Sequence, residues 1–259
     1  MFDGNSSIQV LHVDDDASFL EVSKDLLELD GNFRVDCALS VDEAFGKLES
    51  QRYDAVVSDY EMSPKDGLQF LVELRQRFGG LPFIIFTGRG REEIAIKALN
   101  LGADGYVNKH GKPNVVYAEL MHVIRAAIER AKARVAVEES EKVCRLLLEH
   151  CPVAIFIHDV AGRILDVNPQ ACKSVGYTRG ELLSMNIKDV ESEAGKVDNE
   201  VLLKALAGQH VSFERVYRCK DGATFPVEVN IAAAKRGGAI VIFRFARNIT
   251  VEGSVLRGK

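Results

Sequence analysis

The 259-residue sequence lacks several features that define whole classes of protein. It has no apolar run near the roughly 20 residues of a membrane-spanning helix, and its first residues lack the basic and apolar regions of a signal peptide. Its five cysteines form no CxxC pair, which favours reduced thiols in a cytoplasm over a disulfide framework. Its formal net charge of -5 gives no reason to expect a nucleic-acid-binding surface. We therefore expect a cytoplasmic, globular protein that binds neither DNA nor a membrane.

The first half of the chain alternates short apolar runs with amphipathic stretches. The apolar runs predict β-strands over residues 8–13, 33–38, 54–59, 81–87 and 105–108. The stretches between them predict helices: Ser40 and Glu43 form a capping box before one, and Gly79 follows the end of another. This alternation predicts an α/β fold, with a doubly wound parallel sheet and helices on both of its faces. Such a sheet carries its functional groups at the carboxyl ends of its strands.

The pattern changes near residue 150. Two short strands that meet at a tight turn around Gly162 are followed by two small helices, which begin at Asn168 and Thr178. Polar and apolar residues then alternate around turns at Gly222 and Gly237, which predicts three antiparallel strands. The second half therefore predicts an α+β domain with an antiparallel sheet.

Polar residues end or directly follow four of the five strands predicted in the first half. Asp14, Asp15 and Asp16 follow the first strand, Asp59 ends the third, Thr87 ends the fourth and Lys109 follows the fifth. Clustered carboxylates repel one another unless a cation intervenes, and Mg²⁺ prefers oxygen ligands of the kind that Asp15 and Asp59 offer. A lysine ammonium and a threonine hydroxyl complete a site for a phosphoryl group, with Asp59 as its nucleophile. Each residue alone is more often a turn, a cap or a solvated charge, so the prediction depends on their joint order.

This order resembles the receiver domain of two-component response regulators. The resemblance covers about residues 7–128 and lies in VLHVDDD, SDYEMSPKDG, IIFTGRG and the lysine of YVNK. It implies a flavodoxin-like five-stranded sheet, a Mg²⁺ cofactor and a histidine kinase as the phosphodonor. Two stretches differ from the usual receiver pattern, because Ser63 precedes Pro64 in the loop and His110 and Gly111 separate Lys109 from the next proline.

The same resemblance assigns a role to each site residue. Those roles are phosphoacceptor for Asp59, acidic metal-binding pair for Asp14 and Asp15, backbone carbonyl ligand for Glu61, and switch pair for Thr87 and Tyr106. The chemistry of the strand ends itself makes Lys109 the charge partner of the phosphoryl group. Rearrangement of the switch pair on phosphorylation would reshape the face formed by the fourth helix, the fourth strand and the fifth helix.

Residues 142–251 resemble a PAS domain. The resemblance lies in the D-x-x-G-R-I-x-x-V-N hairpin, the helix after NP, the G-Y-T-x-x-E-L segment, and K-D-G before P-V-E-V. It implies a module that holds a small ligand or that serves dimerisation, and the identity of any ligand is left open. We expect neither flavin nor haem, because Cys172 lies outside a flavin-photosensor motif and neither His158 nor His210 has a setting suited to an axial ligand.

Three other interpretations remain. An aspartyl phosphatase of the haloacid dehalogenase type also uses Asp, Thr and Lys on a doubly wound sheet, and it would use Asp14 rather than Asp59. The GRGRE stretch at residues 88–92 begins like a dinucleotide-binding loop, but it lacks the third glycine and follows the fourth strand. A protein-interaction scaffold with a degenerate receiver is the third alternative, and the complete set of acids, Thr and Lys argues against it.

The expected order of domains is a receiver at residues 1–128, a helical linker at 129–141, a PAS domain at 142–251 and a tail at 252–259. The linker continues the receiver's last helix, because the segment after Pro113 has no proline or glycine and predicts one helix of about 36 residues, roughly 54 Å long.

No histidine-kinase core or DNA-reading helix is recognisable, so we expect a phosphoacceptor and not an enzyme, without a conventional output domain. The long helix would pass the change at Asp59 to the PAS domain. A homodimer through the linker helix, the receiver face or the PAS domain is left open.

Overall fold

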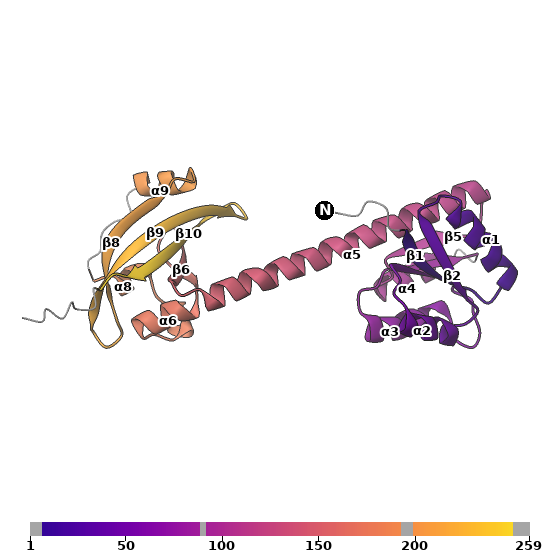
Figure 1. The fold of residues 1–259 in the computed structure, drawn as a ribbon, viewed down its shortest axis with the longest axis horizontal. Helices are drawn as coiled ribbons and strands as arrows, with labels where there is room; N and C mark the ends of the chain where they lie inside the picture. Colours follow the sequence, from indigo (N-terminus) through magenta and orange to yellow (C-terminus); the bar gives the residue numbers. More distant parts are fainter. Residues whose placement is uncertain (1–6, 89–91, 193–198, 251–259) are drawn as a thin grey trace, which may run out of the picture. The chain divides into compact units, whose positions relative to one another are not determined.

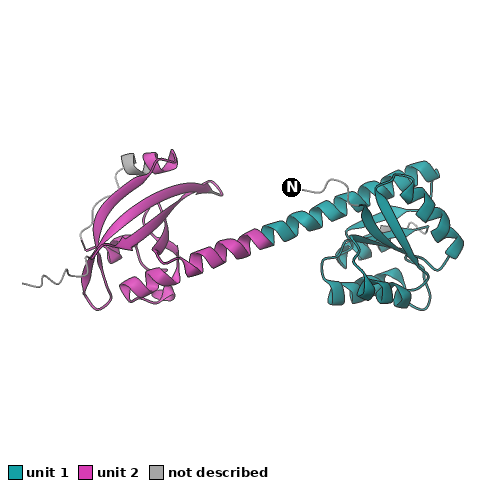
Figure 2. Ribbon diagram, viewed as in Figure 1, with its two compact units in different colours: residues 1–138 teal, residues 139–259 magenta. Residues whose placement is uncertain are grey.

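The structure, a computed structural model, describes residues 7–88, 92–192 and 199–250. The chain divides into two compact units, residues 1–138 and 139–259 (Figure 2). The division lies inside helix α5 (Pro113–His150), in the segment that the sequence predicts as a linker. The predicted domain limits at residues 128 and 142 stay predictions.

The first unit is a parallel sheet between two layers of helices (Figure 1). Its strands are β1 (Ile8–Val13), β2 (Phe33–Ala38), β3 (Ala55–Ser58), β4 (Phe83–Thr87) and β5 (Gly105–Asn108). Its helices are α1 (Ala17–Glu28), α2 (Val41–Ser50), α3 (Gly67–Phe78), α4 (Glu92–Asn100) and the first part of α5. The strand order is β2-β1-β3-β4-β5, with every pairing parallel. This is the flavodoxin-like order, so the predicted doubly wound sheet is confirmed, and its switch point lies between β1 and β3.

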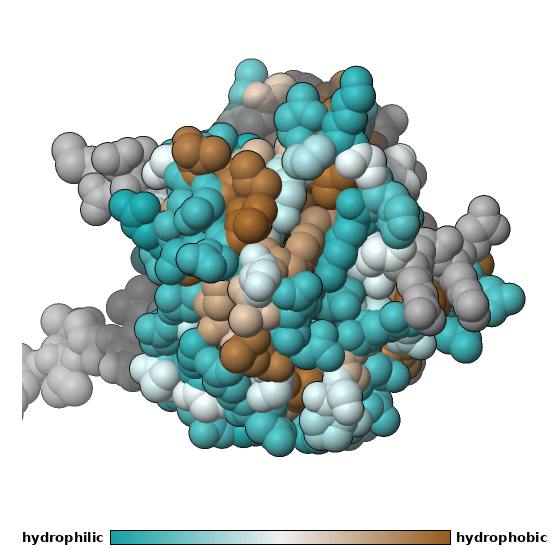
Figure 3. Space-filling model, turned by 90° about the vertical axis from the view of Figure 1, so that its right-hand side faces the viewer, coloured by the Kyte–Doolittle hydropathy of each residue, from teal (hydrophilic) through white to brown (hydrophobic). Residues whose placement is uncertain are grey.

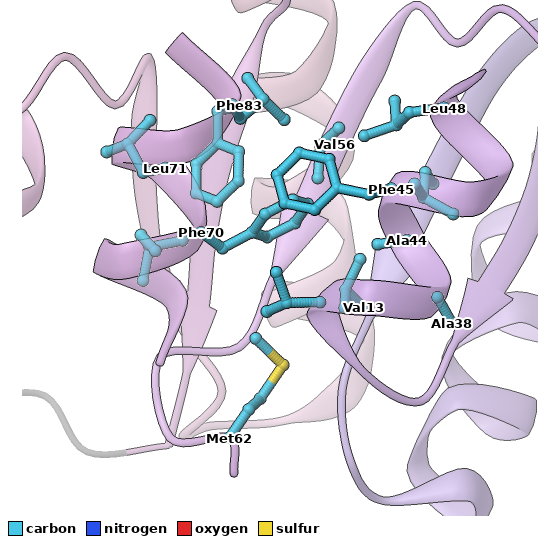
Figure 4. Packing of buried hydrophobic residues seen from close by; sticks show 14 of the residues in the cluster. Val13, Ala38, Ala44, Phe45, Leu48, Val56, Met62, Phe70, Leu71 and Phe83 are labelled. Atoms are coloured by element: carbon cyan, nitrogen blue, oxygen red, sulfur yellow. The ribbon is translucent and has the colours of Figure 1, made fainter. Parts of the chain in front are cut away.

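The strands of the first unit alternate their side chains between two cores, one on each face of the sheet. On one face, Leu11 and Val13 pack against α2 and α3, where the rings of Phe45, Phe70 and Phe83 meet edge to face (Figure 4). Strand residues that alternate with these, such as Val10 and Val57, pack against α1 and α5 on the other face. Because both faces are covered, the strands are apolar throughout, which explains the near-continuous apolar runs in the sequence.

The second unit is an antiparallel sheet with short helices against one face. Its strands are β6 (Ala154–Asp159), β7 (Ile164–Val167), β8 (Val211–Arg218), β9 (Thr224–Arg236) and β10 (Ala239–Asn248), in the order β7-β6-β10-β9-β8. Its helices are α6 (Pro169–Val175), α7 (Arg179–Leu182), α8 (Ile187–Val190) and α9 (Asn199–Leu206). The predicted antiparallel sheet and the first two helices are confirmed. Helices α8 and α9 are absent from the sequence-based prediction, although Asn186 and Asp189 form a capping box at the start of α8.

The core of the second unit lies between the sheet and these helices. Inward side chains of β6 and β9, among them Phe156 and Val229, pack against Val175 of α6 and Leu182 of α7. The sheet therefore has one face turned to the helices, as the alternating sequence pattern requires.

Helix α5 is a single helix of 38 residues, close to the predicted length. Its early residues Leu120, Ile124 and Ala127 are buried against the first sheet, whereas Val143 and Leu147 further along are 55% and 67% exposed.

In the part of the chain that the structure describes, no helix is both long enough and apolar enough to cross a membrane. One face of the molecule carries small groups of hydrophobic side chains on a mainly hydrophilic surface (Figure 3).

Candidate functional site

Backbone hydrogen bonds of the sheet fix the positions of two acidic residues. Asp14 follows β1 and donates its N–H to the carbonyl of Ala38 at 3.1 Å. Asp59 follows β3 and donates its N–H to the carbonyl of Val13 at 2.8 Å. Because β1 and β3 are neighbours, the two residues leave the sheet together at its carboxyl edge.

Lys109 joins these two carboxylates into one cluster. It follows β5, and its N–H donates to the carbonyl of Thr87 at 2.9 Å, which brings its side chain to the same edge. Its Nζ lies 2.6 Å from Asp14 Oδ2 and 3.3 Å from Asp59 Oδ1. The side chains of Lys109, Asp14 and Asp59 are 17%, 3% and 11% exposed, so three charges share a space largely closed to water. The predicted convergence of strand ends is therefore present, while the chemical roles of the residues stay predictions.

A close backbone approach shapes the loop that carries Asp59. Gly67 donates its N–H to the carbonyl of Tyr60 at 2.9 Å, and a Cβ at position 67 would lie only 2.2 Å from the Asp59 carbonyl oxygen. The Ser58 hydroxyl donates to that same oxygen at 2.8 Å. Only glycine fits at position 67, so the glycine of SPKDG is the sequence signal for this geometry.

The Asp59 carboxylate is incompletely neutralised. Burial raises the pKa of Asp59 above its ordinary value; the Lys109 ammonium opposes this rise, and the charge of Asp14 adds to it. Asp59 Oδ1 has no hydrogen-bond partner among the described residues, although Lys109 Nζ lies within ion-pairing distance. A buried carboxylate in this state is suited to binding a cation or to attacking an electrophile.

The orphaned oxygen of Asp59 fits a hard cation, with further oxygen atoms close by. Asp14 is already engaged, because its Oδ1 accepts from the N–H of Asp16 at 2.9 Å and its Oδ2 pairs with the ammonium. Asp15 and Glu61 are exposed. Within the described ranges, no group of three or more acidic, His or Cys side chains could hold a metal ion by itself. The residues therefore fit a cation held by a few protein oxygens and water, as Mg²⁺ usually is, and not a closed protein cage.

The predicted switch residues lie on neighbouring strands at this edge. Thr87 ends β4 and is 1% exposed, and Tyr106 of β5 pairs in register with Ile85, two residues before Thr87. The Tyr106 hydroxyl is buried without a hydrogen-bond partner in the described part of the chain, and burial raises its pKa. The switch role of this pair stays a prediction.

Two aromatic side chains beside the cluster are absent from the sequence-based prediction. His12 precedes Asp14 by two residues, so it leaves the same face of β1; it is fully buried, with Nδ1 3.0 Å from Ser23 Oγ. Burial, together with the charge of Lys109, lowers the pKa of His12 to about 3. The ring of Phe19, at the start of α1, lies 4.2 Å from Lys109 Nζ. Side chains two residues apart on a strand share a face, so the sequence could have placed His12 beside Asp14. No local sequence pattern links Phe19 to Lys109.

In the second unit, a histidine considered above as a haem ligand lies in a buried polar cluster. His158 is 3% exposed, its Nδ1 lies 2.7 Å from the Asp159 carbonyl, and its Nε2 accepts from Arg244 Nε at 3.0 Å. The Arg244 guanidinium also binds Glu191 Oε1, and these two side chains are 2% and 0% exposed. Both ring nitrogens of His158 are thus engaged within the protein, whereas His210 is exposed.

Comparison with known proteins locates two families in the chain. A family model for the response regulator receiver domain matches residues 10–121, and a model for the PAS domain matches residues 152–251. Response regulator Rre1 of Synechocystis sp. is 34% identical over 128 residues, covering 49% of this chain and 54% of that protein. The alkaline phosphatase synthesis transcriptional regulatory protein PhoP of Bacillus subtilis is 31% identical over 117 residues, covering 45% and 48%. The chain thus spans about half the length of the curated relatives it matches.

A solved receiver domain from Clostridium thermocellum is also similar, with 31% identity and a TM-score of 0.44 over 49% of this chain and 98% of that one. The segments matched by the two family models lie inside the two units. They confirm the receiver domain and the PAS domain predicted from the sequence. The chain therefore carries a response regulator receiver domain at residues 10–121, followed by a PAS domain at residues 152–251.

Proposed function

We propose that this chain is a two-component response regulator whose Asp59 accepts a phosphoryl group from a partner histidine kinase. One observation carries the proposal: Asp59 Oδ1 is buried, has no hydrogen-bond partner among the described residues, and lies 3.3 Å from the Lys109 ammonium. In the transfer, an Asp59 carboxylate oxygen bonds to phosphorus as the phosphorus–nitrogen bond of phosphohistidine breaks. The released imidazole nitrogen takes up a proton from water.

The other residues of the cluster act on charge. Lys109 helps to keep Asp59 ionised for attack and then neutralises part of the charge on the transferred group, to which the Thr87 hydroxyl donates a hydrogen bond. Asp14, Asp15, Asp59 and the Glu61 carbonyl would hold a Mg²⁺ ion, which would supply further positive charge beside the transferred group. In this proposal the chain is a phosphoacceptor and not an enzyme that turns over a separate substrate.

Helix α5 is the proposed route from the receiver to the PAS domain. It begins shortly after Lys109 and continues as one helix to His150, just before β6. Rearrangement of Thr87 and Tyr106 on phosphorylation would change the surface that α5 shares with the sheet, and the PAS domain would respond by altered partner or ligand binding. Several apolar residues of α5 are exposed, so the proposal includes a homodimer formed through this helix.

A small phosphodonor tests the acceptor directly. Incubation with acetyl phosphate and Mg²⁺ is expected to give a hydroxylamine-labile acyl phosphate on the wild-type chain and none on Asp59→Asn. Asp54→Asn is the matched control: Asp54 lies at the opposite end of β3, where its Oδ2 accepts from the N–H of Gln9 at 2.8 Å. We expect this control to be phosphorylated like the wild type, and mass spectrometry of intact protein measures all three.

The same experiment separates the alternatives. An adduct that survives in Asp59→Asn and disappears in Asp14→Asn would favour the aspartyl phosphatase, whereas no adduct on the wild type would favour the degenerate scaffold. The dinucleotide-loop alternative falls mainly on residues 89–91, which lie outside the described residues.

A further inference from the structure

The Lys109 ammonium lies against aromatic rings as well as between two carboxylates. Its Nζ lies 4.2 Å from the centre of the Phe19 ring and 5.7 Å from that of Phe86. Both distances are within the range of a cation–π attraction, which strengthens when the charge is shielded from water. The Lys109 side chain is 17% exposed, so it meets that condition.

The two rings are fixed by contacts of their own. Phe19, Phe86 and His12 form a mutually contacting trio, with ring centres 5.9 to 6.1 Å apart. At the start of α1, Asp16 accepts the backbone N–H of Phe19 at 3.0 Å as the helix cap, so the capping bond sets the position of the ring. The Ser23 hydroxyl of the same helix lies 3.0 Å from His12 Nδ1 and anchors the third ring. The aromatic surface is therefore placed by the same helix start that follows the acidic residues.

We propose that Phe19 is a positioning residue for phosphoryl transfer, whose ring holds the Lys109 ammonium between Asp14 and Asp59. A lysine ammonium ends a long flexible stem, so two carboxylates alone leave it many orientations. The face of a ring attracts the ammonium without offering a lone pair, so it restrains Lys109 while leaving N–H groups for phosphoryl oxygens. Transfer then proceeds from a larger fraction of correctly arranged molecules. The kinetic part of this inference rests on the proposed function; the restraint on Lys109 does not.

Plain apolar packing is the rival explanation for Phe19, and a substitution series at this position separates the two. Phe19→Leu removes the π face, Phe19→Tyr retains it, and pentafluorophenylalanine at position 19 keeps the shape of the ring but reverses its quadrupole. Phe83→Leu is the matched control, because Phe83 is a fully buried ring at the opposite end of β4 from Thr87. The pentafluoro ring keeps the test valid even if Phe19→Leu fails to fold.

Two measurements on the full chain decide the matter. With acetyl phosphate and Mg²⁺, we expect the phosphorylation rate constant to fall by about three- to tenfold in the Leu and pentafluoro variants and to stay within about twofold of wild type in Phe19→Tyr and Phe83→Leu. In the absence of any phosphodonor, the ¹H–¹⁵N NMR signal of the Lys109 ammonium should broaden or vanish in the same two variants, because its protons then exchange faster with water.

A pentafluoro variant with a wild-type rate and a wild-type Lys109 signal would overturn the inference. A wild-type chain that accepts no phosphoryl group, but whose Lys109 signal still depends on the ring, would refute the proposed function and support the positioning role. The NMR measurement therefore tells the two failures apart.

Discussion

Both domains bury charged side chains, but they leave those charges in different states. In the receiver domain two carboxylates, Asp14 and Asp59, share the single ammonium of Lys109, and one Asp59 oxygen has no hydrogen-bond partner among the described residues. In the PAS domain one carboxylate, Glu191, pairs with one guanidinium, Arg244, which also donates to His158. Glu191 Oε2 likewise has no hydrogen-bond partner among the described residues, so the two clusters differ in net charge. The receiver cluster keeps an excess of negative charge, whereas the PAS cluster is balanced.

The position of each cluster in its sheet explains the difference. The receiver cluster stands at the carboxyl ends of parallel strands, where loops leave the charges reachable from one side. The PAS cluster combines residues of β6 and β10, which are paired strands, with a residue that follows α8. A buried charge that is unbalanced and reachable is suited to chemistry, while one that is balanced and enclosed contributes to the packing of its domain. The three predictions below test this contrast, from the largest expected effect to the smallest.

Breaking the enclosed pair is expected to have the largest effect. Arg244→Met leaves Glu191 as an unpaired buried charge, which should lower the free energy of unfolding of the PAS domain by about 3–5 kcal/mol. The chain has no tryptophan, so urea titration followed by the amide NMR signals of β10 is a suitable measurement.

The control for this prediction is the double variant Arg244→Met with Glu191→Met, which removes both charges at once. We expect it to recover more than half of the lost stability, because apolar replacements of a whole buried pair are often tolerated. A single variant that loses less than about 1 kcal/mol would mean that the pair is not effectively buried, and the contrast between the domains would not hold.

Acid is expected to weaken the PAS cluster through His158. Burial lowers the pKa of His158 from 6.5 to about 4, and the positive charge of Arg244 contributes to this shift, because a proton on Nε2 would face the guanidinium. Above pH 6.5 this contribution to stability is complete; it is lost as the pH falls from 6.5 to 4, by about 3 kcal/mol in total. Urea titrations across this pH range measure the loss, and His158→Gln should have a flatter profile. If the free energy of unfolding of His158→Gln falls with pH as steeply as that of the wild type, another group causes the acid sensitivity.

The smallest effect is expected at Asp59, and it has the opposite sign. The folded pKa of Asp59 is raised, so its ionised form destabilises the receiver domain; stability falls as the pH rises from the unfolded value of 3.8 through the folded pKa, and it stays lower above that. Asp59→Asn should therefore stabilise the receiver domain at neutral pH, by less than either change expected in the PAS domain. Thermal unfolding at pH 7 measures the gain, with Asp54→Asn as a control that should show none. A loss of stability in Asp59→Asn would mean that the Asp59 charge is compensated by its surroundings, as the Glu191 charge is by Arg244.

Much of the fold and part of the site could be predicted because their signals are local. A strand buried on both faces reads as an apolar run, and a strand with one covered face reads as an alternation, so the parallel and antiparallel sheets are separable in the sequence. Once the strands of the receiver are placed, the geometry of a parallel sheet brings Asp14, Asp59 and Lys109 to one edge. The capping signals at Asn168 and Thr178 likewise locate α6 and α7.

The misses share a physical cause. Phe19 looks like one more apolar residue of α1, and its contact with Lys109 joins residues 90 positions apart. Glu191 and Arg244 are 53 positions apart and read separately as surface charges, yet both are buried. Asp14 and Asp15 are equivalent in a sequence motif, but Asp14 is buried and Asp15 is exposed, because successive residues at a strand end point in opposite directions.

The sequence by itself determined the secondary structure, the two kinds of sheet and the edge at which the reactive residues lie, because periodicity and capping act over a few neighbouring residues. Only the tertiary structure decided which charges are left unbalanced, which are enclosed, and which ring contacts the lysine. Those outcomes depend on side chains that meet across distant parts of the chain, and burial then sets how strongly each charge needs its partner.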